Sequence, residues 1–126
     1  MPDAPVWIGM LAATTRAQGG DRGLARRMLQ EQLESPLAFI RQAAERSLKQ
    51  LQALDDIDVL QTVVDRYQAR TSQYPTSWAD LLRTRDLLAI PRDPSKTPYA
   101  YDPATHMVSL SKGSPLSPLP QGFTGR

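Results

Sequence analysis

Residues 90–110 read IPRDPSKTPYAYDPATHMVSL, and this stretch decides how the second half of the chain folds. It contains four prolines, two tyrosines and the single histidine of the chain. Asp93-Pro94 predicts a corner, because aspartate and proline both favour turns. Residues 99–101 and 107–110 predict two short strands, and Asp102-Pro103 begins the turn over residues 102–106 that joins them. The stretch therefore predicts a folded corner followed by a β-hairpin.

Upstream of this stretch, apolar residues recur at helical spacing in four segments. The segments are separated at Gly19-Gly20, at Ser35-Pro36 and at Asp55-Asp56, where glycine, proline and capping side chains favour helix ends. Short connections between amphipathic helices favour antiparallel neighbours. The apolar faces comprise Val6, Trp7, Met10 and Leu11; Leu24, Met28, Leu29 and Leu33; Leu37, Ile40, Ala44, Leu48 and Leu51; and Ile57, Leu60, Val64 and Tyr67.

The acidic run Asp55-Asp56-Ile57-Asp58 has two interpretations. As caps, Asp55 and Asp56 accept free backbone N–H groups at the start of the fourth helix. As an Asp-x-Asp pair, the run resembles part of a metal site, but no further oxygen ligands follow at fixed spacing. We therefore interpret the run as a helix cap, and the sequence predicts no metal site.

After residue 72 the pattern changes to one short helix, the corner, the hairpin and a proline-rich tail. Ser77 predicts the N-cap of this fifth helix, with Asp80 as the second member of a capping box. Leu116 and Leu119 predict that the tail packs on the helices. The predicted fold is mainly α, a four-to-five-helix antiparallel repeat-like stack with a small C-terminal β-hairpin. Residues 1–72 and 73–126 are expected to pack as one compact unit.

Composition excludes several classes of function. The 126 residues are 40% hydrophobic, carry a net charge of +2 and include no cysteine. The sequence lacks the concentrated basic face that is typical of nucleic-acid binding. It also lacks an apolar run that approaches the ~18 residues of a membrane span. No phosphate loop, Gly-x-Ser-x-Gly, His-Glu-x-x-His or dinucleotide motif occurs. The sequence therefore predicts a non-enzyme without a cofactor, and the expected partner is another protein.

Five residues are candidates for contact with that partner: Trp7, Arg22, Arg26, Tyr74 and Tyr99. The arginines form a basic patch that suits an acidic surface, although a solvated helix face is the simpler interpretation. Tryptophan and tyrosine are favoured in contact surfaces because they combine an apolar ring with a polar edge.

His106 is the only candidate for imidazole chemistry. A catalytic triad would need Asp102 together with Ser109 or Ser111. We interpret His106 as a turn residue, and keep a hydrolase as the least favoured alternative.

The segment from residue 58 to residue 110 resembles the major pseudopilins of type II secretion. The resemblance rests on Tyr67, Tyr74-Pro75, Trp78-x-x-Leu81-Leu82, Pro91-x-Asp93-Pro94 and Pro98-Tyr99-x-Tyr101. It implies a helix ending in a tyrosine-rich turn, a short helix, and a corner that leads into antiparallel strands. Lys96 and His106 stand where that family has glycine, so both are predicted to adopt left-handed backbone. The acidic calcium loop of the family is absent, and no calcium site is carried over.

The first half resembles helical repeats. Residues 12–25 are similar to a tetratricopeptide helix pair, and Ser35-Pro36 with Ile40, Arg41, Ala44 and Leu48 is similar to the second helix of a HEAT repeat. Together the resemblances imply a non-catalytic interaction or repeat-capping module. They also imply that the chain is the C-terminal part of a larger protein of the bacterial cell envelope, anchored in a membrane through preceding sequence. The expected location is the periplasmic side of the envelope, or otherwise the cytoplasm. The alternative is a divergent pilin-like component of a secretion or pilus assembly.

Overall fold

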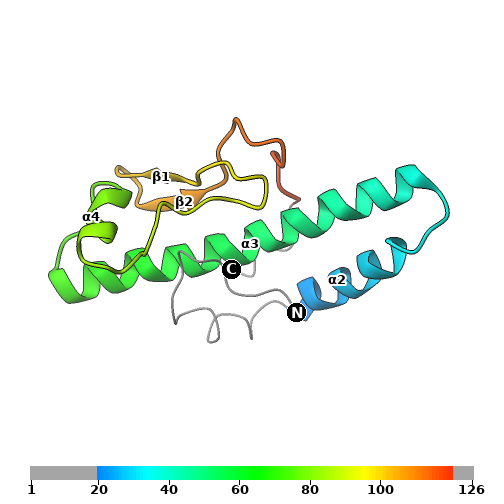
Figure 1. The fold of residues 1–126 in the computed structure, drawn as a ribbon. Helices are drawn as coiled ribbons and strands as arrows, with labels where there is room; N and C mark the ends of the chain where they lie inside the picture. Colours follow the sequence, from blue (N-terminus) through cyan, green and yellow to red (C-terminus); the bar gives the residue numbers. More distant parts are fainter. Residues whose placement is uncertain (1–19, 121–126) are drawn as a thin grey trace.

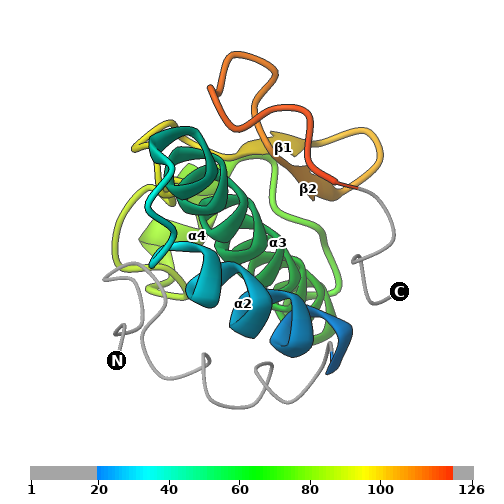
Figure 2. The same ribbon diagram turned by 90° about the vertical axis from the view of Figure 1, so that its right-hand side faces the viewer.

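The computed structural model describes residues 20–120. The long helix α3, Ala38–Thr71, is the axis of the molecule, and α2, Gly20–Gln32, runs antiparallel along one side of it (Figure 1). The short helix α4, Trp78–Arg83, and the strands β1, Ala100–Asp102, and β2, Met107–Ser109, lie on other sides of α3 (Figure 2). We call residues 91–120, which contain the corner, the hairpin and the tail, the C-terminal layer. The first predicted helix, with its apolar residues 6–11, lies outside the described residues.

The predicted break at Asp55-Asp56 is wrong, because α3 is one continuous helix of 34 residues. The third and fourth predicted helices are therefore collinear, and the antiparallel repeat-like stack is not confirmed. No glycine or proline occurs between Pro36 and Pro75, so the backbone has no reason to break. Asp55 and Asp56 lie in the middle of α3 and cap no helix, and their side chains have partners elsewhere in the fold.

Helix α2 packs on α3 with a different face from the predicted one. Leu29 and Leu33 are half-buried as expected, but Leu24 and Met28 are each 54% exposed. The buried side chain at the start of α2 is Arg22, which pairs with aspartates of α3. The contact between these two helices is thus apolar at one end and ionic at the other.

Ser77 is the N-cap of α4 as predicted, and its Oγ accepts the backbone N–H of Ala79 at 3.2 Å. The capping box is altered, because Asp80 accepts the backbone N–H of Thr76, one residue before the cap, at 2.8 Å. Leu81 is fully buried, so the short helix is held to α3 by its apolar side.

The hairpin is confirmed, with each strand ending within one residue of its predicted limit. Tyr101 faces Val108 in the antiparallel register. Lys96 and His106 have φ angles of 73° and 63°, so the left-handed backbone predicted at both positions is also confirmed. The turn closes with a hydrogen bond from the His106 N–H to the Asp102 carbonyl at 2.7 Å.

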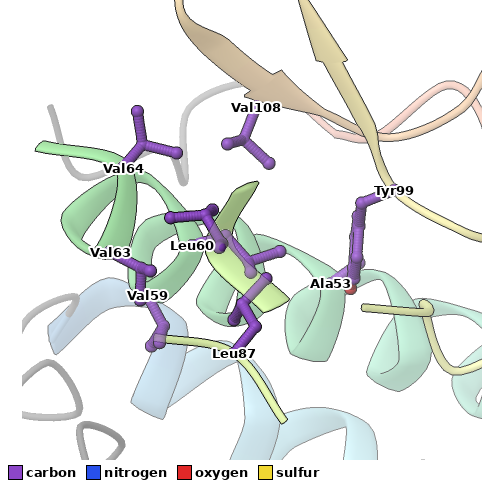
Figure 3. Packing of buried hydrophobic residues seen from close by; sticks show 9 residues of the cluster. Ala53, Val59, Leu60, Val63, Val64, Leu87, Tyr99 and Val108 are labelled. Carbon is purple, nitrogen blue, oxygen red and sulfur yellow. The ribbon is translucent and has the colours of Figure 1, made fainter. Parts of the chain in front are cut away.

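The core forms where the later half of α3 meets the segments after it (Figure 3). Leu60 and Val64 of α3 are completely buried, and Val108 of β2 packs over them. Leu116 of the tail is buried and Leu119 packs on the core, as predicted. The cluster comprises Ala53, Val59, Leu60, Val63, Val64, Leu81, Leu87, Tyr99 and Val108.

Candidate functional site

The most unusual group in the core is the carboxyl of Asp56, which is 2% exposed. The Tyr99 hydroxyl donates a hydrogen bond to its Oδ2 at 2.7 Å, and Gln52 Nε2 donates to its Oδ1 at 2.9 Å. Tyr99 lies along α3 beside Ala53 (Figure 3). The buried carboxyl of Asp56 therefore joins α3 to Tyr99, the residue just before β1.

Tyr99 is held in place through its backbone as well as its ring. Its N–H donates to the Pro91 carbonyl at 3.0 Å, and its carbonyl accepts the indole N–H of Trp78 at 3.0 Å. Because α4 and the corner both fix Tyr99, its hydroxyl is positioned to meet Asp56.

A second buried aspartate, Asp93, organises the corner. Its Oδ1 accepts the backbone N–H groups of Ser95 at 2.7 Å and Thr97 at 3.1 Å, together with the Ser95 hydroxyl. Its Oδ2 accepts the Ser114 hydroxyl at 2.7 Å, which ties the tail to the corner. The corner that the sequence predicts thus depends on this side chain as well as on Pro94.

The two aspartates have opposite pKa shifts. Burial raises the pKa of Asp56 to about 6, because two hydrogen bonds offset only part of the cost of desolvating its charge, and Asp55 and Asp93 repel it. Burial also acts to raise the pKa of Asp93, but the hydrogen bonds from Ser95, Ser114 and Thr97 outweigh it and lower the pKa. The balance between desolvation, which is stronger at Asp56, and hydrogen-bond donors, which are more numerous at Asp93, decides the direction of the shift.

Both carboxyls are buried and serve contacts within the fold. Burial and the carboxylate of Asp56 also raise the pKa of the Tyr99 phenol, which keeps the hydroxyl protonated as a donor.

Three further polar side chains on one face of α3 hold the main chain of the C-terminal layer. Gln61 Nε2 donates to the His106 carbonyl at 2.8 Å, and its Oε1 accepts the Val108 N–H at 2.9 Å. Gln50 Nε2 donates to the carbonyls of Leu116 and Pro118 at 2.9 and 3.1 Å. Arg46 reaches two tail carbonyls in the same way. These bonds satisfy backbone groups that a two-stranded hairpin and an irregular tail leave open.

Arg22 and Arg26, two of the predicted contact residues, are engaged within the chain. Arg22 is 3% exposed and its Nη1 lies 2.9 Å from Asp55 Oδ1 and 2.7 Å from Asp58 Oδ2. Arg26 Nη2 lies 2.7 Å from Asp55 Oδ2 and remains partly exposed. The acidic run that we interpreted as a cap is in fact the partner of the basic patch.

The other three predicted contact residues have different environments. Tyr99 is buried as described above, and Trp7 lies outside the described residues. Tyr74 is 40% exposed, and its ring stacks on the His106 imidazole with centroids 3.7 Å apart and planes 7° apart. Of the five, Tyr74 is the one with a large exposed aromatic surface among the described residues.

The structure does not bring the proposed triad residues together. The Asp102 carboxylate accepts the N–H of Ala104 at 2.8 Å, and Ser111 Oγ accepts the N–H of Gly113 at 3.2 Å. His106 Nδ1 lies 3.5 Å from the Tyr101 hydroxyl, which itself donates to the Pro75 carbonyl at 2.7 Å. His106 therefore belongs to an aromatic cluster beside the hairpin turn.

Sequence reasoning missed the polar side chains inside the fold, namely Gln50, Gln61 and the buried carboxyl of Asp56. Gln50 and Gln61 each lie next to a buried leucine, and Asp56 interrupts an apolar face of α3. A polar residue among apolar neighbours was therefore the available signal. Their partners in the C-terminal layer are 43 to 68 residues away in the chain, so no local pattern identifies them.

Comparison with protein-family models, curated proteins and solved structures found no match to this chain. Within residues 20–120, none of the helices combines the length and the apolar character that crossing a bilayer requires. The same part of the chain has no cluster of three or more acidic, histidine or cysteine side chains suited to a metal ion.

Proposed function

We propose that this protein is a non-catalytic protein-interaction module, in which the C-terminal layer caps one part of α3 and another part is offered to a protein partner. The observation that carries the proposal is an apolar surface on residues 20–49, which we call the α2–α3 arm. Leu24 and Met28 are each 54% exposed, Leu37 is 50% exposed and Phe39 is 68% exposed. Leu24 and Met28 lie on α2, whereas Leu37 and Phe39 lie where α3 begins. Exposed apolar groups in one region of a fold are typical of interaction sites.

A groove between the two helices adds to this surface. It has a volume of about 360 Å³ and is lined mainly by apolar atoms, with Met28 and Leu29 on α2, Leu51 on α3 and Pro120 of the tail among the lining residues. By contrast, the later half of α3 is covered by the hairpin and α4. The proposal assigns the covered half to stability and the arm to binding. The pseudopilin and repeat resemblances support a place in a larger bacterial envelope protein.

The second candidate is a pilin-like assembly component. It is favoured by one observation: a long unbroken helix is followed by a short helix, a corner and a hairpin along its side, in the order that the pseudopilin resemblance implies. In this case the corner and hairpin, rather than the arm, would contact the next protein.

Two methionines of nearly equal exposure separate the candidates. Met28 lies on the arm at 54% exposure, and Met107 lies on the hairpin at 52%. A photo-crosslinking amino acid is introduced at either position, or as a control at Asp65, an exposed polar residue of α3 outside both the arm and the hairpin, and the full chain is irradiated in its source cells. The interaction module predicts a discrete crosslinked protein from position 28, and the assembly component predicts one from position 107. Crosslinking at position 28 no stronger than at position 65 would refute the first proposal.

A further inference from the structure

Asp56 lies at the boundary between two parts of the fold that differ in their internal support. On one side is α3, a continuous helix with its own backbone hydrogen bonds. On the other is the C-terminal layer, which has two three-residue strands and depends on side chains of α3 for several backbone partners. Tyr99 is the residue of the layer that touches the carboxyl.

The surroundings of the carboxyl favour its neutral form. An ionised carboxylate accepts about four hydrogen bonds, whereas the structure gives Asp56 two donors, Tyr99 and Gln52. The charged groups that act on it are acids, Asp55 on α3 and Asp93 in the corner. On the α2 side, Arg22 is engaged by Asp55 and Asp58.

We propose that Asp56 is an acid-sensitive clasp: when neutral it holds the C-terminal layer on α3, and when ionised it loosens that layer. The neutral carboxyl keeps both contacts, because a hydroxyl can accept as well as donate and the Gln52 amide can turn its oxygen inward. The ionised carboxyl is a buried charge with too few donors. Its cost is relieved by admitting water, which requires Tyr99 and the layer to move rather than the helix to unfold.

The direction of the pH effect follows from burial and repulsion, which raise the pKa of Asp56 to about 6. In the open state the exposed carboxyl returns to its ordinary value near 3.8. The closed layer therefore holds a proton that the open layer has lost, so its closure is favoured in acid. This contribution is complete below the ordinary value and is lost as the pH rises through about 6.

Asp93 behaves in the opposite sense, because its pKa is lowered. Its protonation weakens the corner only in more acidic solution than the range in which Asp56 titrates. Between pH 5 and pH 8, the window of the test, Asp56 is thus the carboxyl of the layer interface whose charge changes.

The test is backbone amide exchange of the full chain, expressed as protection factors at pH 5 and pH 8 so that the intrinsic rates cancel. The reporter is the Tyr99 N–H, which is bonded to Pro91, and amides in the middle of α3 are the internal reference. In the wild type, the protection factor of the Tyr99 amide is expected to fall about tenfold from pH 5 to pH 8. The reason is that pH 5 lies one unit below the pKa of Asp56 in the closed layer, so protonation favours closure about tenfold there and not at pH 8. The α3 amides change less.

Asp56→Asn mimics the neutral carboxyl, so its protection at position 99 is expected to be independent of pH and at least as high as the wild-type value at pH 5. Asp65→Asn, which alters an exposed acid of the same helix, is expected to keep the wild-type pH dependence. Equal pH dependence in Asp56→Asn and the wild type would overturn the proposal. If Asp56→Asn does not fold, the carbon-13 shift of the Asp56 carboxyl in the wild type decides: titration at or below pH 4 refutes the clasp.

Discussion

Gln61→Ala tests how the hairpin is attached to α3. The side chain of Gln61 is 5% exposed and bonds the main chain at the start of β2, namely the carbonyl of the turn residue His106 at 2.8 Å and the Val108 N–H at 2.9 Å. Val108 lies opposite Tyr101 of β1, and its N–H is donated to Gln61 rather than to β1. The amide of Gln61 therefore occupies the edge of β2 that β1 leaves open, and it replaces the backbone of a third strand.

The magnitude follows from the groups left without partners. Removing the amide leaves a buried N–H and a buried carbonyl, and each costs about 1–3 kcal/mol when unsatisfied. Water entering from the hairpin side recovers part of this cost. We therefore expect Gln61→Ala to lower the free energy of unfolding by about 3 kcal/mol.

The assay is urea denaturation followed by circular dichroism, together with amide exchange at Val108. Gln68→Ala is the matched control, because Gln68 is a half-buried glutamine of the same helix. We expect the control to change stability by less than about 0.5 kcal/mol. A loss below about 1 kcal/mol in Gln61→Ala, or unchanged protection of the Val108 amide, would show that the hairpin does not depend on Gln61.

Three further substitutions test the ionic contact, the corner backbone and the corner carboxylate. Arg22→Ala should lower the free energy of unfolding by about 3 kcal/mol, because it leaves Asp55 and Asp58 without their buried cation. The control is Arg27→Ala, which removes an exposed arginine of the same helix. Equal losses of stability for the two variants in thermal denaturation would contradict the prediction. Lys96→Gly should stabilise by about 1 kcal/mol, because φ is 73° there, whereas Lys112→Gly should give no gain in the same measurement. Asp93→Ala should destabilise by about 2 kcal/mol at pH 7, and less as the pH falls through the lowered pKa of this carboxyl, since its stabilisation is lost on protonation; an effect equal at pH 7 and pH 2.5 in urea denaturation would argue against it.

Local chemistry made the second half of the fold predictable. Proline, aspartate and the tyrosine pair specify a corner and a hairpin within residues 90–110, and each of these elements involves neighbours in sequence. The start of α4 at Ser77 was predictable for the same reason, because a cap and its acceptor lie within one helical turn. The left-handed angles of Lys96 and His106 were predicted in another way, from the pseudopilin resemblance, in which glycine occupies both positions.

The candidate site was not predictable, because its members come from distant parts of the chain. Asp55 and Asp56 look like caps when only the next few residues are considered. Their partners are Arg22 and Tyr99, which approach only after α2 and the corner have packed on α3. An aspartate whose carboxyl has a partner in the fold is tolerated in the middle of a helix. The cap interpretation and the predicted helix break were therefore wrong for the same reason.

The sequence by itself indicated the helical segments, the corner and the hairpin, since turn chemistry and apolar periodicity act over a few residues. It also indicated left-handed backbone at Lys96 and His106, but not at Ser72 or Arg85. Only the tertiary structure decided that two predicted helices are one, which face of α2 is buried, and which polar side chains are enclosed. The physical reason is that the free energy of a charged or amide side chain depends on what surrounds it. Asp56 and Asp93 are the same residue type, yet their pKa values move in opposite directions, because Asp56 is more strongly desolvated and has two donors, whereas Asp93 has four.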